Sequence, residues 1–416
     1  MKILSHQENI SLILSIGLML IAARLFGEFF RKFRMPLVVG ELIAGVLLGP
    51  TLLGKFYPQI SSTIYTNNPH ASLALNGITS VSIIMLLFVA GMELNLSLIR
   101  QQGKAAFSAS VFGLIFPLLI GFVTAYYGYE YYGRNSSDKL VFALFMGTSM
   151  AISALPVIAR TLIDLNLFKT KVGSIIITAA MFDDLMGWIL FSMIMGMLKG
   201  SANHSVVLTL LFTISYALLI LTIGRFLINK SMPWAQKNFS WPGGFLSMAL
   251  GLAFLGAAFT EYIGLHAIFG AFIMGIAIGD SVHVTEKTKD IVSQFVTNIF
   301  APLFFVSIGF KVNFIDHFNL QITALVIGLA FIGKILGGFI GSKIGGLNNN
   351  ESWAVGFGLN ARGAMEIILA TLAFQAKLIG EELFVAIVIM AVVTSIMAGP
   401  MMSWLVKTKA SLDNNL

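Results

Sequence analysis

The sequence predicts an all-α integral membrane protein, and its composition and mean hydropathy are the two observations behind this prediction. Of the 416 residues, 57% are hydrophobic and only 11% are charged, whereas soluble domains carry about 25% charged residues. The mean hydropathy is +0.88. Because so few charges cannot cover a water-facing surface, we expect most of the surface to face a lipid bilayer.

Apolar runs long enough to cross the membrane set the order of the predicted elements. A spanning helix needs about 20 mostly apolar residues. We predict about thirteen spans, at 9–29, 36–54, 71–94, 104–127, 139–163, 171–199, 205–228, 243–262, 264–280, 293–311, 320–345, 352–376 and 382–406. Lys and Arg are more frequent in alternate loops, which predicts a multi-pass protein of the cell membrane with its N-terminus outside and its C-terminus in the cytoplasm.

The composition and the motifs also argue against several other classes of function. The chain has no cysteine, which rules out disulfides and thiolate chemistry. Its net charge of +7 comes from basic residues in short loops between apolar runs, so we do not expect nucleic-acid binding. No phosphate-binding glycine loop, zinc-ligand spacing or nucleophile triad is present, so we expect neither an enzyme nor a cofactor.

Two parts of the chain resemble each other. The glycine spacing of the second span recurs in the ninth, as Gly40, Gly45 and Gly49 against Gly270, Gly275 and Gly279. Each copy is followed by a similar helix end, FVAGMELN and FVSIGFKVN. The ninth span comes seven spans after the second, and because this difference is odd the copies are antiparallel, which predicts the inverted repeats typical of secondary transporters. The glycine spacing alone is equally consistent with close helix packing.

The sixth span carries two adjacent acids, Asp183 and Asp184, in the middle of an apolar run. A charge inside the membrane is costly and needs a partner, water or a function. Neighbouring helix positions point about 100° apart, so one acid can face a cationic partner while the other faces water. Repulsion between the two favours a proton on one of them. Competition between a proton and a hard monovalent cation for that carboxylate would constitute an exchange mechanism.

Lys334, in the middle of the eleventh span, is the predicted partner of one aspartate. The alternative is a lysine whose amine reaches the membrane surface. In the fifth span, Pro156 predicts a helix break, and Thr148 and Ser149 add hydroxyls just before it. The alternative there is a simple proline kink.

The twelfth span contains Asn360, Arg362 and Glu366 among helix-loosening glycines, which predicts a second broken helix. Arg362 and Glu366 are four residues apart and can pair on one face of a helix. A buried ion pair with a purely structural role is the other interpretation.

Seven motifs in this order resemble the second cation:proton antiporter branch of the monovalent cation:proton antiporters, with the sodium/hydrogen exchanger-like fold. They are GELIAGVLLGP, LLFVAGMEL, TSMAISALPVIAR, the FDD of the sixth span, PLFFVSIGF, IGKILGG and LNARGAMEIIL. The resemblance covers essentially the whole chain. In many bacterial relatives the glutamate of the last motif lies two residues after the arginine, whereas here Glu366 lies four after Arg362.

The resemblance implies a homodimer in which each protomer has a scaffold bundle (about 1–103 and 240–318), a mobile core bundle (about 104–200 and 319–416) and a linker helix (about 205–230). Two discontinuous helices would cross in the core. It further implies that Asp184 binds Na⁺ or K⁺ and protons and that Asp183 pairs with Lys334. Thr148 and Ser149 would lie at the first crossing, and Arg362 and Glu366 near the second.

The expected function is therefore electrogenic exchange of a monovalent cation, Na⁺ foremost, for protons by alternating access. The chain stops at Leu416, so we expect no soluble regulatory domain. K⁺/H⁺ exchange is the alternative within transport, because both ions use oxygen ligands. A gated cation channel and a sensor without transport activity are alternatives of other classes.

Overall fold

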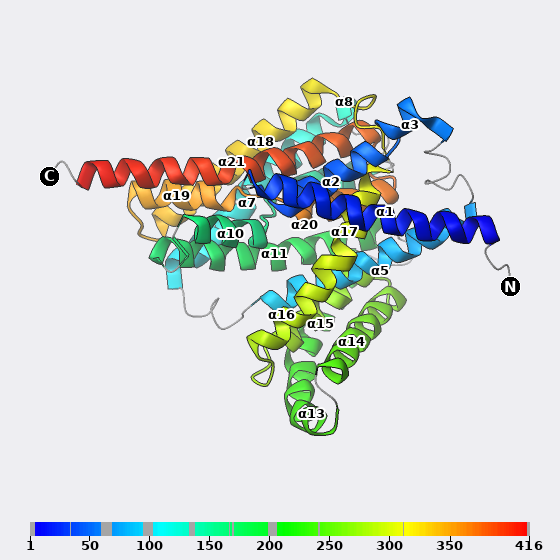
Figure 1. The fold of residues 1–416 in the computed structure, drawn as a ribbon. Coiled ribbons are helices and arrows are strands. Elements are labelled where there is room, and N and C mark those ends of the chain that lie inside the picture. Colours follow the sequence, from blue (N-terminus) through cyan, green and yellow to red (C-terminus); the bar gives the residue numbers. More distant parts are fainter. Residues whose placement is uncertain are drawn as a thin grey trace. The chain divides into compact units, whose positions relative to one another are not determined.

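The computed structural model is built of helices, and its described residues contain no strand (Figure 1). It describes residues 5–33, 35–59, 69–94, 103–132, 138–165, 167–168, 170–198, 206–239, 242–310 and 312–413. Some loop and terminal charges used for the orientation lie outside these residues, namely Lys2, Arg34, Arg100, Arg134, Lys169, Lys199 and Lys311. The chain divides into two compact units, Met1–Asn95 with Met195–Asp316 (unit 1) and Leu96–Ile194 with His317–Leu416 (unit 2).

Unit 1 contains most of the N-terminal quarter and the middle of the chain. Its elements are α1 (His6–Arg31), α2 (Leu37–Leu48), α3 (Leu53–Phe56), α5 (Pro69–Glu93), α12 (Val206–Leu219), η1 (Ile220–Gly224), α13 (Arg225–Asn238), α14 (Gly243–Tyr262), α15 (Ala267–Gly279), α16 (Glu286–Phe295), η2 (Val296–Phe300) and α17 (Ala301–Gly309). Two π-helical turns, η1 and η2, each join an α-helix to the next without a break. The predicted span at 205–228 is therefore the first part of a longer helix that continues to Asn238.

Unit 2 contains the remaining helices. They are α7 (Gly103–Tyr127), α8 (Tyr129–Tyr132), α9 (Lys139–Ala151), α10 (Leu155–Asp164), α11 (Lys171–Leu198, whose last turn is counted with unit 1), α18 (Leu320–Ile344), α19 (Asn349–Leu359), α20 (Ala364–Gln375) and α21 (Glu381–Asp413). Within this unit α7 packs against α9 and α18, and α18 packs against α19 and α21.

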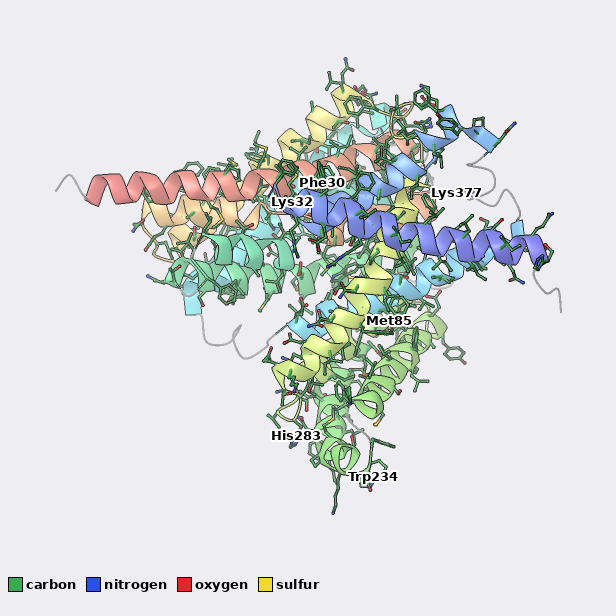
Figure 2. All side chains as sticks on the ribbon, viewed as in Figure 1. Phe30, Lys32, Met85, Trp234, His283 and Lys377 are labelled. Carbon is green, nitrogen blue, oxygen red and sulfur yellow. The ribbon has the colours of Figure 1, made fainter. Side chains whose placement is uncertain are left out.

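The predicted class of an all-α membrane protein is confirmed. Ten helices in the described part of the chain are long and apolar enough to cross a membrane, and the pair α19 and α20, bent by 44°, makes eleven. Two shorter apolar helices, α9 and α15, account for the remaining predicted runs. The count of about thirteen crossings stays a prediction. Side chains distinguish the interior from the surface (Figure 2): Met85 is buried, whereas Trp234 is 61% exposed.

The glycines of the repeated motif are sites of close helix contact inside unit 1. A β-carbon at Gly45 in α2 would lie 2.3 Å from the backbone oxygen of Val306 in α17. A β-carbon at Gly275 in α15 would lie 2.2 Å from the backbone oxygen of Phe88 in α5. Each glycine helix therefore packs against the helix end that belongs to the other copy, so the two repeats are intertwined.

Both predicted helix breaks are present in unit 2, and they touch each other. The first lies at 152–154, between α9 and α10, and the second at 360–363, between α19 and α20. The backbone N–H of Ala154 donates to the carbonyl of Ala361 at 2.9 Å. The first break precedes Pro156, which lies in the first turn of α10, where its missing N–H has no helical acceptor to lose.

Candidate functional site

The two adjacent acids lie in the middle of α11, and both are buried, with exposed fractions of 0% for Asp183 and 1% for Asp184. Asp183 forms an ion pair with Lys334 of α18, in which Nζ and Oδ2 are 2.6 Å apart. Two hydroxyls also donate to its carboxylate, Ser110 of α7 at 3.2 Å and Ser153 of the first break at 3.1 Å. Asp183 is thus held from three sides.

Asp184 has very different surroundings from its neighbour. The backbone N–H of Leu155, the first residue of α10, faces the carboxylate of Asp184. Its Oδ1 atom is buried and, within the described residues, has no hydrogen-bond partner. The N-terminus of a helix carries a partial positive charge, so the broken helix attracts an anion at this point while leaving one carboxylate oxygen open to a further ligand.

Cations occupy the opposite end of the break, at the C-terminus of α9. Arg362 donates to the carbonyl of Ser149 at 2.9 Å and to the carbonyl of Met150. Lys334 donates to the carbonyl of Ala151, the last residue of α9. No backbone N–H of α9 donates to these last carbonyls of the helix, and positive charge is favourable at a helix C-terminus. The break is therefore stabilised by opposite charges at its two ends.

Arg362 also joins the second break to the rest of the unit. Its guanidinium pairs with Glu366 at 3.2 Å, and it donates to the carbonyl of Ala330 in α18, also at 3.2 Å. Glu366 in turn accepts from the backbone N–H of Gly363 at 2.8 Å. The predicted pairing of Arg362 with Glu366 is present. The contacts of Arg362 with α9 and α18 hold the second break in place.

The formal charges of this cluster do not cancel. Three carboxylates (Asp183, Asp184 and Glu366) face two cations (Lys334 and Arg362), which leaves one negative charge when all five are ionised. All five side chains are at most 1% exposed. Uncompensated buried charge is strongly unfavourable. One proton or one monovalent cation would neutralise the cluster.

Two predicted residues next to the first break, Thr148 and Ser149, form no hydrogen bond to an aspartate within the described part of the chain. The hydroxyls of Thr148 and Ser149 donate within α9, to Leu144 at 2.8 Å and Met146 at 3.0 Å. A hydroxyl that donates in this way keeps lone pairs with which it can bind a cation. Asn360, at the end of α19, is 1% exposed, and neither polar atom of its side chain has a partner among the described residues.

Sequence reasoning missed Ser110. Small hydroxyl residues are common in membrane helices, where most donate to their own backbone, as Ser342 does. Ser110 instead donates across to α11, and the predicted span at 104–127 gave no sign of which residue it faces. Ser153 was visible as a hydroxyl near the break, but its bond to Asp183 depends on the fold.

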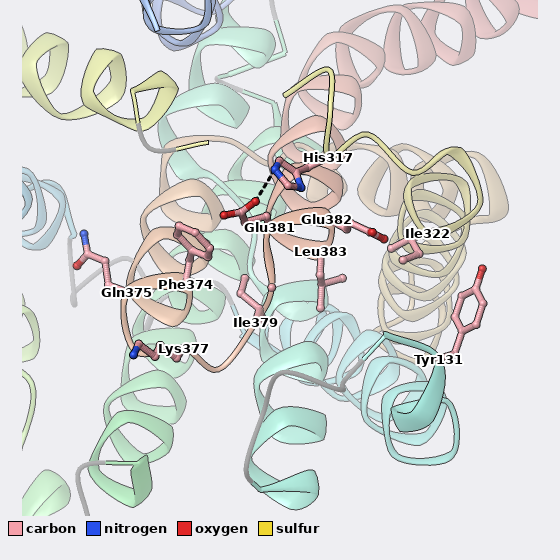
Figure 3. A pocket seen from close by; sticks show the side chains of 11 residues that line it. Tyr131, His317, Ile322, Phe374, Gln375, Lys377, Ile379, Glu381, Glu382 and Leu383 are labelled. Carbon is pink, nitrogen blue, oxygen red and sulfur yellow. Dashed lines mark ion pairs between the residues drawn. The ribbon is translucent and has the colours of Figure 1, made fainter. Parts of the chain in front are cut away.

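A separate pocket of about 850 Å³ lies elsewhere in unit 2 (Figure 3), and none of the predicted site residues lines it. Its lining includes Tyr131, Lys377 and Glu382. His317 and Glu381 form an ion pair across 2.5 Å on its wall. These groups are substantially exposed, unlike the buried cluster.

Comparison with known proteins gives consistent results. Residues 16–408 match the model of the transmembrane sodium/hydrogen exchanger family. The chain is 31% identical to the Na⁺/H⁺ antiporter NhaS4 of Synechocystis sp., covering 94% of this chain and 95% of that protein. It is 29% identical to K⁺/H⁺ antiporter 1 of Saccharomyces cerevisiae, covering 92% of this chain and 45% of that protein.

The chain thus spans about half the length of the yeast relative, and the same holds for several similar proteins of Arabidopsis thaliana. Among solved structures it resembles the sodium proton antiporter MjNhaP1 of Methanocaldococcus jannaschii, with a TM-score of 0.66 at 16% identity. The match covers 95% of this chain and 97% of that one. At this identity the likeness concerns the fold alone.

Proposed function

Since this chain belongs to the transmembrane sodium/hydrogen exchanger family, we propose that it is a secondary antiporter that exchanges a monovalent cation, Na⁺ foremost, for protons. The observation that carries the proposal is the buried cluster of three acids and two bases around two touching helix breaks. Binding of one cation or one proton would neutralise its single uncompensated negative charge. Relatives named as Na⁺/H⁺ antiporters support Na⁺ as the cation.

In this proposal Asp184 is the carboxylate for which the cation and the proton compete. The Asp184 oxygen that has no hydrogen-bond partner is the proposed ligand, and the N-terminus of α10 faces the carboxylate. Thr148 and Ser149, one turn before the break, are the neighbouring hydroxyls. Asp183 and Lys334 form a neutral pair beside it. In the proton-loaded state Asp183 separates from Lys334, which keeps its charge, and takes a second proton from solution, so two protons exchange for one cation and exchange is electrogenic.

Alternating access follows from the energetics of charge. With Asp184 empty and ionised, the cluster carries an uncompensated charge that opposes passage through an apolar barrier, whereas the cluster that holds one cation is neutral. We assign the scaffold role to unit 1 and the mobile core to unit 2, which holds all the charges of the cluster. We further propose a homodimer in the cell membrane, with the N-terminus outside and the C-terminus in the cytoplasm.

Transport in everted vesicles tests the proposal. Addition of Na⁺ should dissipate a pre-formed pH gradient, and Asp184→Asn should abolish this response while leaving the protein folded in the membrane. Because one proton competes with one cation, the apparent KM for Na⁺ should rise by up to about tenfold for each unit of falling pH. Full activity of Asp184→Asn would show that the site is assigned wrongly.

K⁺/H⁺ exchange is the second candidate, and the similarity to the yeast K⁺/H⁺ antiporter 1 favours it specifically. The same vesicle measurement with Na⁺, K⁺ and Li⁺ separates the two. Current without counter-transport would indicate a channel, and saturable cation binding without either flux would indicate a sensor.

A further inference from the structure

Asn360 is the residue of the crossing whose surroundings the exchange mechanism has not yet explained. It ends α19 and is 1% exposed. Both its Oδ1 and its Nδ2 are buried and have no partner in the described part of the chain. Buried side-chain amides are nearly always hydrogen-bonded, because leaving one unpaired is destabilising. If Asn360 served only to fill space, a leucine of similar volume would stabilise the fold more, because it has no polar atoms to leave unpaired.

The position of Asn360 links it to the site of Asp184. Ala361, the next residue, accepts a hydrogen bond from Ala154 at 2.9 Å. Leu155, which follows Ala154, has its backbone N–H facing the carboxylate of Asp184. Asn360 and Asp184 are thus both linked to the same short stretch of the first break. Among the described residues, each of these two side chains holds a buried oxygen without a hydrogen-bond partner.

The local backbone does not need the Asn360 side chain. The helix end is already satisfied by main-chain bonds, since the N–H of Asn360 donates to the carbonyl of Phe357 at 3.3 Å. The carbonyl of Leu359 accepts from Ser153 at 2.8 Å. The amide is therefore neither a helix cap nor a bridge between the two breaks.

We propose that the Asn360 amide oxygen is a direct ligand of the transported cation, opposite Asp184, and that it helps to set the choice between Na⁺ and K⁺. This inference rests on the proposed exchange function. A neutral carbonyl oxygen is a suitable ligand for a hard monovalent cation. It adds no charge, so one cation still neutralises the cluster. Selectivity between Na⁺ and K⁺ depends on the number and strength of such oxygens.

Asn360→Leu tests this role because leucine nearly preserves the volume and removes both polar atoms. The apparent KM for the preferred cation should rise about tenfold, the loss of one good ligand. The ratio of the KM values for Na⁺ and K⁺ should also change several-fold. In the purified full-length protein without cation, the unfolding temperature should stay equal or rise, because a buried unpaired amide is gone. NaCl or KCl should then stabilise the variant less than the wild type.

Thr371→Val is the matched control, since it removes another buried polar group of unit 2, a hydroxyl that donates to its own helix at 2.7 Å. It should leave the KM ratio unchanged. Asn360→Ala provides a second test if leucine does not fit. Unchanged KM values and an unchanged Na⁺/K⁺ ratio in both Asn360 variants would overturn the inference, while the loss of transport in Asp184→Asn would still support the exchange function.

Discussion

Both units of the molecule contain close contacts between glycine and backbone, but they differ in the charge that they bury. A β-carbon would lie 2.3 Å from a backbone oxygen at Gly45 and 2.2 Å at Gly275 in unit 1, and 2.4 Å at Gly337 and 2.3 Å at Gly341 in unit 2. In unit 2 five ionisable side chains are also buried together, held by each other and by the ends of broken helices, while one Asp184 oxygen has no partner among the described residues. Close backbone packing resists deformation, whereas a charged cluster responds to protons and ions. The difference places the cluster of ionisable groups in unit 2.

Unit 1 also buries acidic side chains. Glu41 of α2, next to Gly40, is 6% exposed. One of its carboxylate oxygens has no partner in the described residues. Its burial follows from the close contact of Gly40 with α1, where a β-carbon would lie 2.4 Å from the carbonyl oxygen of Phe26.

The largest effect should come from Gly45→Ala in unit 1. The added methyl would lie 2.3 Å from a backbone oxygen of α17, and because the overlapping atom is backbone, α2 and α17 must move apart along their whole contact. We expect a clear loss of folded protein in thermal unfolding of purified samples. Gly77→Ala in α5, where a β-carbon meets nothing within 4 Å, should be neutral or slightly stabilising. Equal behaviour of the two variants would contradict the packing account.

The next largest effect should come from Lys334→Met in unit 2, because it leaves Asp183 buried without its cation. Removal of one partner of a buried pair costs about 3–5 kcal/mol. The double variant Lys334→Met with Asp183→Asn should recover much of this stability, since the carboxylate that Lys334 compensated is then also removed. A denaturation series of the wild type, both single variants and the double variant measures the coupling. Additive losses would show that the 2.6 Å pair does not act as a unit.

A smaller effect is expected from the two buried serines of α7. Ser110→Ala removes a hydrogen bond to the Asp183 carboxylate, worth about 1.5–3 kcal/mol, whereas Ser108→Ala removes a bond to the neutral carbonyl of Gly341, worth about 1 kcal/mol. Only the first should alter the pH profile of exchange, because only Ser110 contacts the cluster. Transport rates measured across a pH series distinguish the variants, and a shifted profile for Ser108→Ala would contradict this division.

The smallest effect should come from Glu381→Gln, which breaks the His317 pair beside the pocket. The two side chains are 37% and 43% exposed, and exposed pairs contribute about 0–1 kcal/mol. Thermal unfolding and Na⁺-driven exchange should both stay close to wild type. A loss of stability as large as that of Lys334→Met would contradict the idea that exposed ion pairs in this unit contribute less than buried ones.

Much of the candidate site could be read from the sequence, because a charge inside an apolar run is conspicuous wherever it falls. Asp183, Asp184, Lys334, Arg362 and Glu366 were identified in this way, and all are fully or almost fully buried. The two breaks were foreseen from proline, glycine and polar residues. Ser110 could not be singled out, because nothing local distinguishes a hydroxyl that bonds its own helix from one that bonds a neighbour.

The sequence by itself determined that the chain is a helical membrane protein, where its helices break and which charges must be buried, because hydropathy and the cost of burying a charge are local properties. Tertiary structure alone decided which groups meet. Lys334 pairs with Asp183 across 151 positions of sequence, and Arg362 reaches Ser149 across 213. The glycine helices pack on the opposite repeat. A pattern along one helix records which face is apolar but not which helix will cover it, and that choice arises only when all segments pack together.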